Sequence, residues 1–188
     1  MVTVVADGVH VLLAVSLVVA VLRTRRAEPY LVAILAASVP DLDKYLFTPF
    51  VYAGYLSGPL WTHRGITHSL LALLLFVGVA HRVGHWRAAV IGYGSHLVAD
   101  YLTGGIRLFA PFTVRLHGLY YDWMLGNVVA GSFAVVVTVV GLAAMLRLGA
   151  DADGDGGAGT GTGTGTDAGA GALTADDPFG RFSRWWFR

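Results

Sequence analysis

Five apolar segments dominate the first 148 residues and limit the folds open to this chain. A helix that crosses a bilayer needs about 20 mainly apolar residues, because each residue adds only about 1.5 Å of rise. The 188-residue chain is 55% hydrophobic with a mean hydropathy of +0.63, which is too apolar for a soluble domain. Residues 1–148 therefore predict an all-α, polytopic membrane domain of about five helices, with apolar segments at 9–22, 30–39, 69–80, 86–102 and 128–148.

Basic residues predict how this domain is oriented, because Lys and Arg accumulate on the cytoplasmic side of a membrane. If all five segments span, one side receives Arg23, Arg25, Arg26, Arg82, Arg87 and Arg147. The other side receives only Lys44, Arg64, Arg107 and Arg115. We therefore expect a multi-pass protein of the inner (cytoplasmic) membrane, with the N-terminus outside and the C-terminal tail in the cytoplasm.

The last 40 residues have a different composition. Residues 149–177 are almost entirely Gly, Ala, Thr and Asp, so they have nothing to bury and are expected to form a disordered, flexible linker. Residues 178–188 interleave Phe and Trp with Arg, a composition that suits a membrane interface but also a disordered end.

Seven residues of metal-ligand type lie within or beside the apolar segments. Ionisable groups are costly inside a membrane and usually mark a functional site or a water-filled cavity. With five spans, all seven fall toward the face where the first, third and fifth segments begin. The chain has no cysteine, so a metal there would need imidazole and carboxylate ligands. The candidate metal ligands are His10, Asp41, Asp43, His63, His68, His96 and Asp100.

The spacing of these residues suits a shared ion. His96 and Asp100 are four apart and so share one face of a helix. Asp41 and Asp43 follow Pro40 and could serve one ion or two. Neutral imidazole with carboxylate suits zinc, and also manganese or iron, so we predict one or two divalent ions with zinc the first choice. Taken singly, the His–Asp pair could be a plain hydrogen bond, and His10 an interfacial residue.

The stretch HRGITHSL, residues 63–70, places two of these histidines directly before an apolar segment. Gly65 permits a sharp bend that could turn both imidazoles inward, and Thr67 is the predicted N-cap of the following helix. Arg64 falls outside the charge bias and is predicted to contact an anionic substrate. Its alternative role is to pair with a neighbouring carboxylate.

The motifs PDLD, HRGITHSLL and GYGSHLVADYLT, followed by RLFAPF, occur in the order typical of a known group. Over roughly residues 8–125 the chain resembles the LexA-regulated, membrane-bound, metal-dependent hydrolases of the inner membrane. The resemblance implies a metal-dependent hydrolase. It carries the ligand role to Asp41, Asp43, His63, His68, His96 and Asp100.

A remoter similarity concerns the zinc-dependent phospholipase C and single-strand nuclease superfamily, which cleaves phosphodiesters. That superfamily has a second HxxxE-type pair, whereas His117 and Asp122 of this chain are five apart. The similarity therefore implies at most part of such a zinc cluster. The matching positions are His10, Asp41 or Asp43, His68, His96 and Asp100.

These observations favour a metal-dependent hydrolase that cleaves a phosphoester of a membrane lipid or similar amphiphile with metal-activated water. Asp41 or Asp43 could accept the proton and Arg64 could hold the phosphate oxygens. A non-catalytic membrane protein with a structural metal site is the alternative. A metal transporter is a third possibility, although it would need polar residues at several depths. Nothing indicates nucleic acid as a partner, and the oligomeric state is open.

Overall fold

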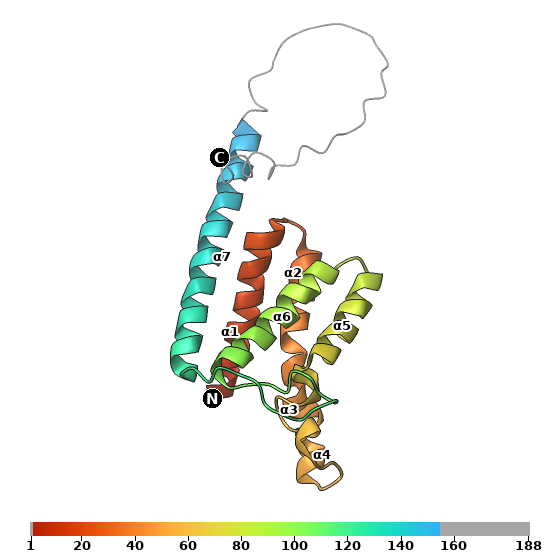
Figure 1. Ribbon diagram of the computed structural model, residues 1–188. Helices are drawn as coiled ribbons and strands as arrows, with labels where there is room; N and C mark the ends of the chain where they lie inside the picture. The colour runs from red at the N-terminus through yellow and green to blue at the C-terminus, as the bar shows by residue number, and fades with distance from the viewer. Residues whose placement is uncertain (1, 155–188) are drawn as a thin grey trace, which may run out of the picture. The chain divides into compact units, whose positions relative to one another are not determined.

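The computed structural model describes residues 2–154, and the surroundings of side chains for residues 7–146. Within that range the chain is helical, as expected (Figure 1). The longer helices are α1 (Val2–Leu17), continued by a π-helical turn at Val18–Leu22, α2 (Ala27–Ser38), α5 (Leu70–Arg82), α6 (Trp86–Thr103) and α7 (Trp123–Gly154). Short helical pieces join α2 to α5: Pro40–Leu42, α3 (Asp43–Leu46), α4 (Thr48–Tyr52), Pro59–Trp61 and Ile66–His68.

Helix α6 is the centre of the fold, because it packs against α1, α2 and α5. Small residues make close packing with α2 possible, as they do between helices in membranes. A Cβ at Gly92 of α6 would lie 2.2 Å from the carbonyl oxygen of Ala33. The buried alanines Ala36 and Ala37 of α2 line the same contact. The backbones of α2 and α6 are therefore as close as glycine allows.

The ends of α2 and α5 follow from local sequence. Pro40 lacks an amide hydrogen and begins the 3-10 turn that follows α2. Helix α5 is capped by Ser69, whose hydroxyl accepts a hydrogen bond of 3.2 Å from the amide of Ala72. The prediction that Thr67 caps this helix is wrong, because residues 66–68 form a separate 3-10 turn and the Thr67 hydroxyl bonds a carboxylate instead.

Membrane crossing is supported for one helix of the described residues. Trp123–Leu146 of α7 has 24 residues, a mean hydropathy of 2.4 and only 6% of its most apolar window buried. Helix α2 has 12 residues, or about 18 Å, against a hydrocarbon core of about 30 Å. The five-span arrangement is thus not confirmed. Helices α2 and α5 and the segment Asp7–Leu22 are shorter than a span, and α6 is not apolar enough.

The chain divides into two compact units, Met1–Val139 and Val140–Arg188. The first holds the packed helices and the first half of α7. In the second, α7 continues past the expected end at Leu148 to Gly154. Most of the predicted linker and all of the segment 178–188 lie outside the described residues.

We predict that Gly92→Ala lowers the stability of the fold by about 1–3 kcal/mol, because the added methyl group forces α2 and α6 apart. Thermal unfolding in detergent measures the effect. Gly94→Ala is the matched control in the same helix, since a Cβ there meets nothing within 4 Å. Equal stability of the two variants would contradict the close packing of α2 and α6.

Candidate metal centre

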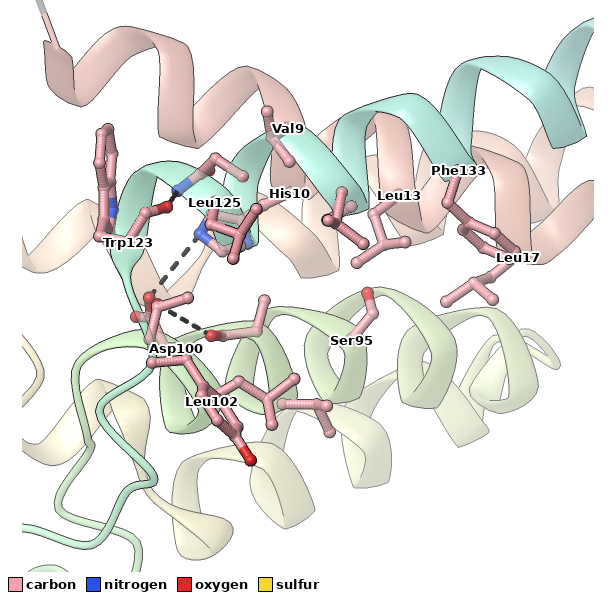
Figure 2. Close-up of a pocket in the computed structure, with 18 of the residues that line it drawn as sticks. Val9, His10, Leu13, Leu17, Ser95, Asp100, Leu102, Trp123, Leu125 and Phe133 are labelled. Carbon is pink, nitrogen blue, oxygen red and sulfur yellow. Dashed lines mark hydrogen bonds and ion pairs between the residues drawn. The ribbon is translucent and has the colours of Figure 1, made fainter.

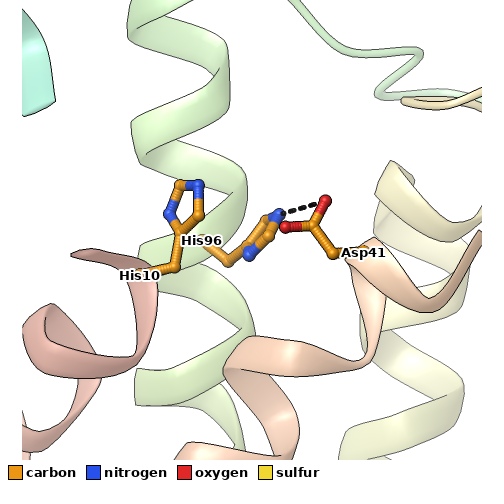
Figure 3. Close-up of side chains that lie close together, drawn as sticks. All are labelled: His10, Asp41 and His96. Atoms are coloured by element: carbon orange, nitrogen blue, oxygen red, sulfur yellow. Dashed lines mark ion pairs between the residues drawn. The ribbon is translucent and has the colours of Figure 1, made fainter. Parts of the chain in front are cut away.

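The structure brings the seven predicted ligands into one cluster, here called the His/Asp cluster. Its members come from α1, from the turn after α2, from the start of α3, from the segment 63–68 and from α6. Figure 3 shows three of them, His10, His96 and Asp41, turned toward one another from three elements. Six of the seven are buried; His63, whose side chain is 37% exposed, is at the rim. Their role as metal ligands stays a prediction.

His96 is held in one orientation by the helix beside it. Its Nδ1 donates a hydrogen bond of 2.8 Å to the carbonyl of Ala37, near the end of α2. With its proton on Nδ1, the ring presents the lone pair of Nε2 to the cluster. That nitrogen lies 3.2 Å from His68 Nε2 and 3.6 Å from Asp100 Oδ2. A backbone carbonyl on the far nitrogen is the usual way in which a metal-binding histidine is fixed.

His68 lies at the centre of the cluster and is fully buried. Its Nε2 is 3.2 Å from Asp100 Oδ2 and 3.7 Å from Asp41 Oδ1. Burial acts to lower the pKa of this imidazole, but hydrogen bonds to the surrounding carboxylates outweigh burial and raise the pKa to about 10. The negative charge around His68 therefore favours a cation.

Asp43 orients the segment 63–68. Its Oδ1 accepts a hydrogen bond of 3.0 Å from His63 Nδ1. Its Oδ2 accepts from the amide of Arg64 at 3.2 Å and from the hydroxyl of Thr67 at 2.9 Å. Burial acts to raise the pKa of Asp43, but hydrogen bonds with His63 and His68 hold it well below the usual range. With both oxygens occupied in this way, Asp43 is better placed to position the histidines than to bind an ion directly.

The cluster contains three overlapping groups of three residues each, and within each group the ligand atoms all lie within 4.8 Å of one another. Asp41 belongs to two of these groups, so it could contact an ion on either side. His10 also belongs to one: its ring centroid is 4.0 Å from that of His96, and its buried Nδ1 has no hydrogen-bond partner. The groups are His10 with Asp41 and His96, Asp41 with His63 and His68, and His68 with His96 and Asp100.

Two supporting residues were not expected from the sequence. Lys44 Nζ lies 2.9 Å from Asp41 Oδ1 and 2.9 Å from Asp7 Oδ1, so it holds the first carboxylate of PDLD in place. The hydroxyl of Tyr93 donates to the carbonyl of Thr67 and ties the segment 63–68 to α6. The position of Lys44, three residues after Asp41, could have indicated the contact between Lys44 and Asp41. No sequence spacing indicated the contact between Tyr93 and Thr67.

Arg64 pairs with a carboxylate, which was the alternative role considered for it. Its Nη2 lies 2.7 Å from Asp100 Oδ1, while its side chain stays 21% exposed. The backbone of Arg64 has a φ of 63°, a left-handed conformation that is uncommon for a residue other than glycine. Gly104 makes room for the guanidinium, because a Cβ there would lie 1.6 Å from Nη1. Contact with an anionic substrate stays a prediction.

Gly65 is required at the bend of this segment. A Cβ at Gly65 would lie 2.2 Å from the carbonyl oxygen of Leu60 and 2.7 Å from that of Thr62. The expected sharp turn is therefore present, and it is close contact with the preceding backbone that demands glycine there. The remaining histidines, His81, His85 and His117, join none of the three ligand groups.

The described residues thus form a helical domain with a buried His/Asp cluster, a candidate metal centre, and one exposed helix that is long and apolar enough to cross a membrane. The chain belongs to the YdjM inner membrane protein family, whose model matches residues 6–152. This membership is consistent with the resemblance to the LexA-regulated inner-membrane group, and it brings no support for the phospholipase C and nuclease superfamily. No curated protein matches the chain, and no solved structure does.

We predict that Gly104→Ala pushes the Arg64 guanidinium away from Asp100 and lowers stability by about 1 kcal/mol or less, because only the end of a flexible side chain has to move. A double-mutant cycle with Arg64→Ala measures the coupling, because the cost should largely vanish once the guanidinium is gone. Gly78→Ala, where a Cβ meets nothing within 4 Å, is the control. Fully additive effects of Gly104→Ala and Arg64→Ala would show that Gly104 does not serve Arg64.

Proposed function

We propose that this protein is a membrane-bound, metal-dependent hydrolase that cleaves a phosphoester of a lipid or similar amphiphile. The observation that carries the proposal is the meeting of His68 and His96 with Asp41 and Asp100 beside an apolar pocket. The protein acts in the inner membrane, where its family is found. Following the arginine distribution, we propose that its N-terminus lies outside and its tail in the cytoplasm.

The residues of the cluster fit a divalent metal, with zinc the first choice. Imidazole and carboxylate ligands suit zinc. The hydrogen bond from His96 Nδ1 to the carbonyl of Ala37 already orients the His96 ring, so that its other nitrogen is free for a metal. The buried Nδ1 of His10 without a hydrogen-bond partner is a further unsatisfied ligand atom. A bound ion would supply Lewis-acid activation of water and of phosphate oxygens. Asp41 belongs to two ligand groups, and this supports a site for a second ion.

The surrounding residues position the reacting groups. Asp43 is enclosed by donors on both oxygens, so Asp41 is the better placed carboxylate to accept a proton. Arg64 keeps one amino group on Asp100 and its side chain is partly exposed, so its remaining N–H groups can donate to phosphate oxygens. The left-handed backbone of Arg64 fixes the direction in which its side chain leaves the segment.

The complete burial of His68 and His96 also favours a structural metal site. In that case the ion would stabilise the fold without turnover. A transporter is less well supported, because residues 123–146 of α7 carry no charged group. Zinc binding and turnover, measured separately, distinguish catalysis from a structural role.

We predict that purified protein binds zinc, and that His96→Ala weakens zinc affinity more than the roughly 10–100-fold typical of losing an outer hydrogen-bond partner. Zinc content after competition with a chelator, read by elemental mass spectrometry, measures this. His81→Ala is the matched control, since His81 is exposed on α5 and belongs to no ligand group. Zinc bound equally well by His96→Ala would remove the metal centre from the proposal.

We predict that the metal-loaded protein hydrolyses phospholipids or a model phosphodiester, and that His68→Ala with Asp100→Ala lowers the rate at least about a hundredfold. A matched pair outside the cluster, His81→Ala with Glu28→Gln, should keep the rate. Full activity of the cluster variant would end the hydrolase proposal. Zinc binding that raises the melting temperature, with no turnover on any substrate, would instead establish the structural role.

A further inference from the structure

An apolar pocket of about 740 Å³ lies between α1, α6 and the first turns of α7, within the first compact unit. This volume falls inside the range of about 300–1,000 Å³ that is usual for small-molecule sites. Two members of the His/Asp cluster, His10 and Asp100, are part of its wall. Figure 2 shows these two residues near Trp123 at one end of the pocket, with Leu13, Leu17 and Phe133 extending away from them.

The polar groups of the pocket gather at the end beside the cluster. Thr103, Asp122 and Asn127 join His10 and Asp100 there, at the last turns of α6 and the start of α7. Farther along, the only polar wall residue is Ser95, and its hydroxyl already donates to the carbonyl of Gly92 at 3.0 Å. The rest of the wall is apolar and extends along α1 and the following π-helical turn to Val21. An occupant must therefore be polar at one end and hydrocarbon along the rest.

The length of the pocket fits one acyl chain. Its wall follows α1 and the π-helical turn after it from Val9 to Val21, which corresponds to about 18 Å of helix rise. The hydrocarbon of one leaflet is about 15 Å deep, half of a core of about 30 Å.

Aromatic side chains place the cluster end of the helices at the membrane surface. Tyr and Trp concentrate where bilayer and water meet. Exposed tyrosines and phenylalanines crowd the segments 43–61 and 106–122, which lie beside the cluster end of α6 (Figure 1). The cluster would then lie at headgroup depth and the pocket at acyl depth. The exposed aromatic residues are Tyr45, Phe50, Tyr52, Tyr55, Phe109, Phe112, Tyr120 and Tyr121.

We propose that this pocket holds an acyl chain of a membrane phospholipid whose phosphate lies at the His/Asp cluster. The proposal rests on the proposed function, because an anionic phosphate beside Asp100 requires a bound cation. It identifies the substrate as a lipid still in its leaflet, entering with its hydrocarbon between α1 and α7. The headgroup is then presented to Arg64 and the cluster.

Photo-crosslinking tests the occupant directly. The full chain is reconstituted in a bilayer with a phospholipid that carries a photoactivatable group at the end of one acyl chain. Mass spectrometry then locates the adducts. We expect adducts in residues 13–21 and 125–133, and a loss of at least about tenfold in Ala130→Phe, which fills the pocket. Ala143→Phe, on an exposed position of α7 outside the pocket, should leave labelling unchanged.

A second measurement needs no variant. In the wild-type protein, adduct yield should rise with acyl length until the chain reaches about 18 Å and then level off. A yield independent of acyl length, or labelling as strong at the exposed Leu74 and Leu75 of α5 as in the pocket, would overturn the proposal. Pocket labelling without any hydrolysis would refute only the proposed function. Hydrolysis of a water-soluble phosphodiester without pocket labelling would refute only the lipid pocket.

Discussion

The hydrogen bond from His96 Nδ1 to the carbonyl of Ala37 is the contact on which the site depends. The last carbonyls of a helix have no partner within it, and Pro40 stops α2 from continuing, so this acceptor is open to a side chain from elsewhere. His96 reaches it because Gly92 lets α6 lie directly on α2. A buried imidazole and a buried carbonyl would each be costly alone, and together they fix which nitrogen faces the cluster.

The rest of the cluster is arranged around that fixed ring by a segment with little regular structure. Residues 63–68 are held by Asp43 through a side chain, a backbone amide and a hydroxyl, and by Tyr93 through a carbonyl. Such irregular backbone is acceptable at membrane depth only where protein or water surrounds it. Short helices and loops at one end of the bundle therefore create the polar site, while α7 supplies the long apolar helix.

Sequence reasoning succeeded where chemistry is local. The apolar runs predicted α2, α5 and α6 within a few residues, although α1 begins at Val2, well before the predicted segment 9–22. The bend at Gly65 was also correctly predicted. Prediction from the sequence failed where the hydrogen-bond or ion-pair partner of a residue comes from a distant segment. Thr67 looked like a helix cap because Asp43, its actual partner, is far away in sequence. Lys44 was read as a charge on one side of the membrane, whereas it holds Asp41. The five-span count is not confirmed, because hydropathy reports composition and does not fix the length of a helix.

By itself the sequence determined that this chain is helical, apolar and equipped with histidines and aspartates as its candidate metal ligands, because periodicity and composition act within a single segment. Only the tertiary structure decided what each of these residues does. It separated Asp43, whose oxygens hold the segment 63–68, from Asp41, which faces two ligand groups. It paired Arg64 with Asp100 and opened an apolar pocket beside His10. Those roles depend on distances between α1, α2 and α6, and such distances are set by packing rather than by spacing along the chain.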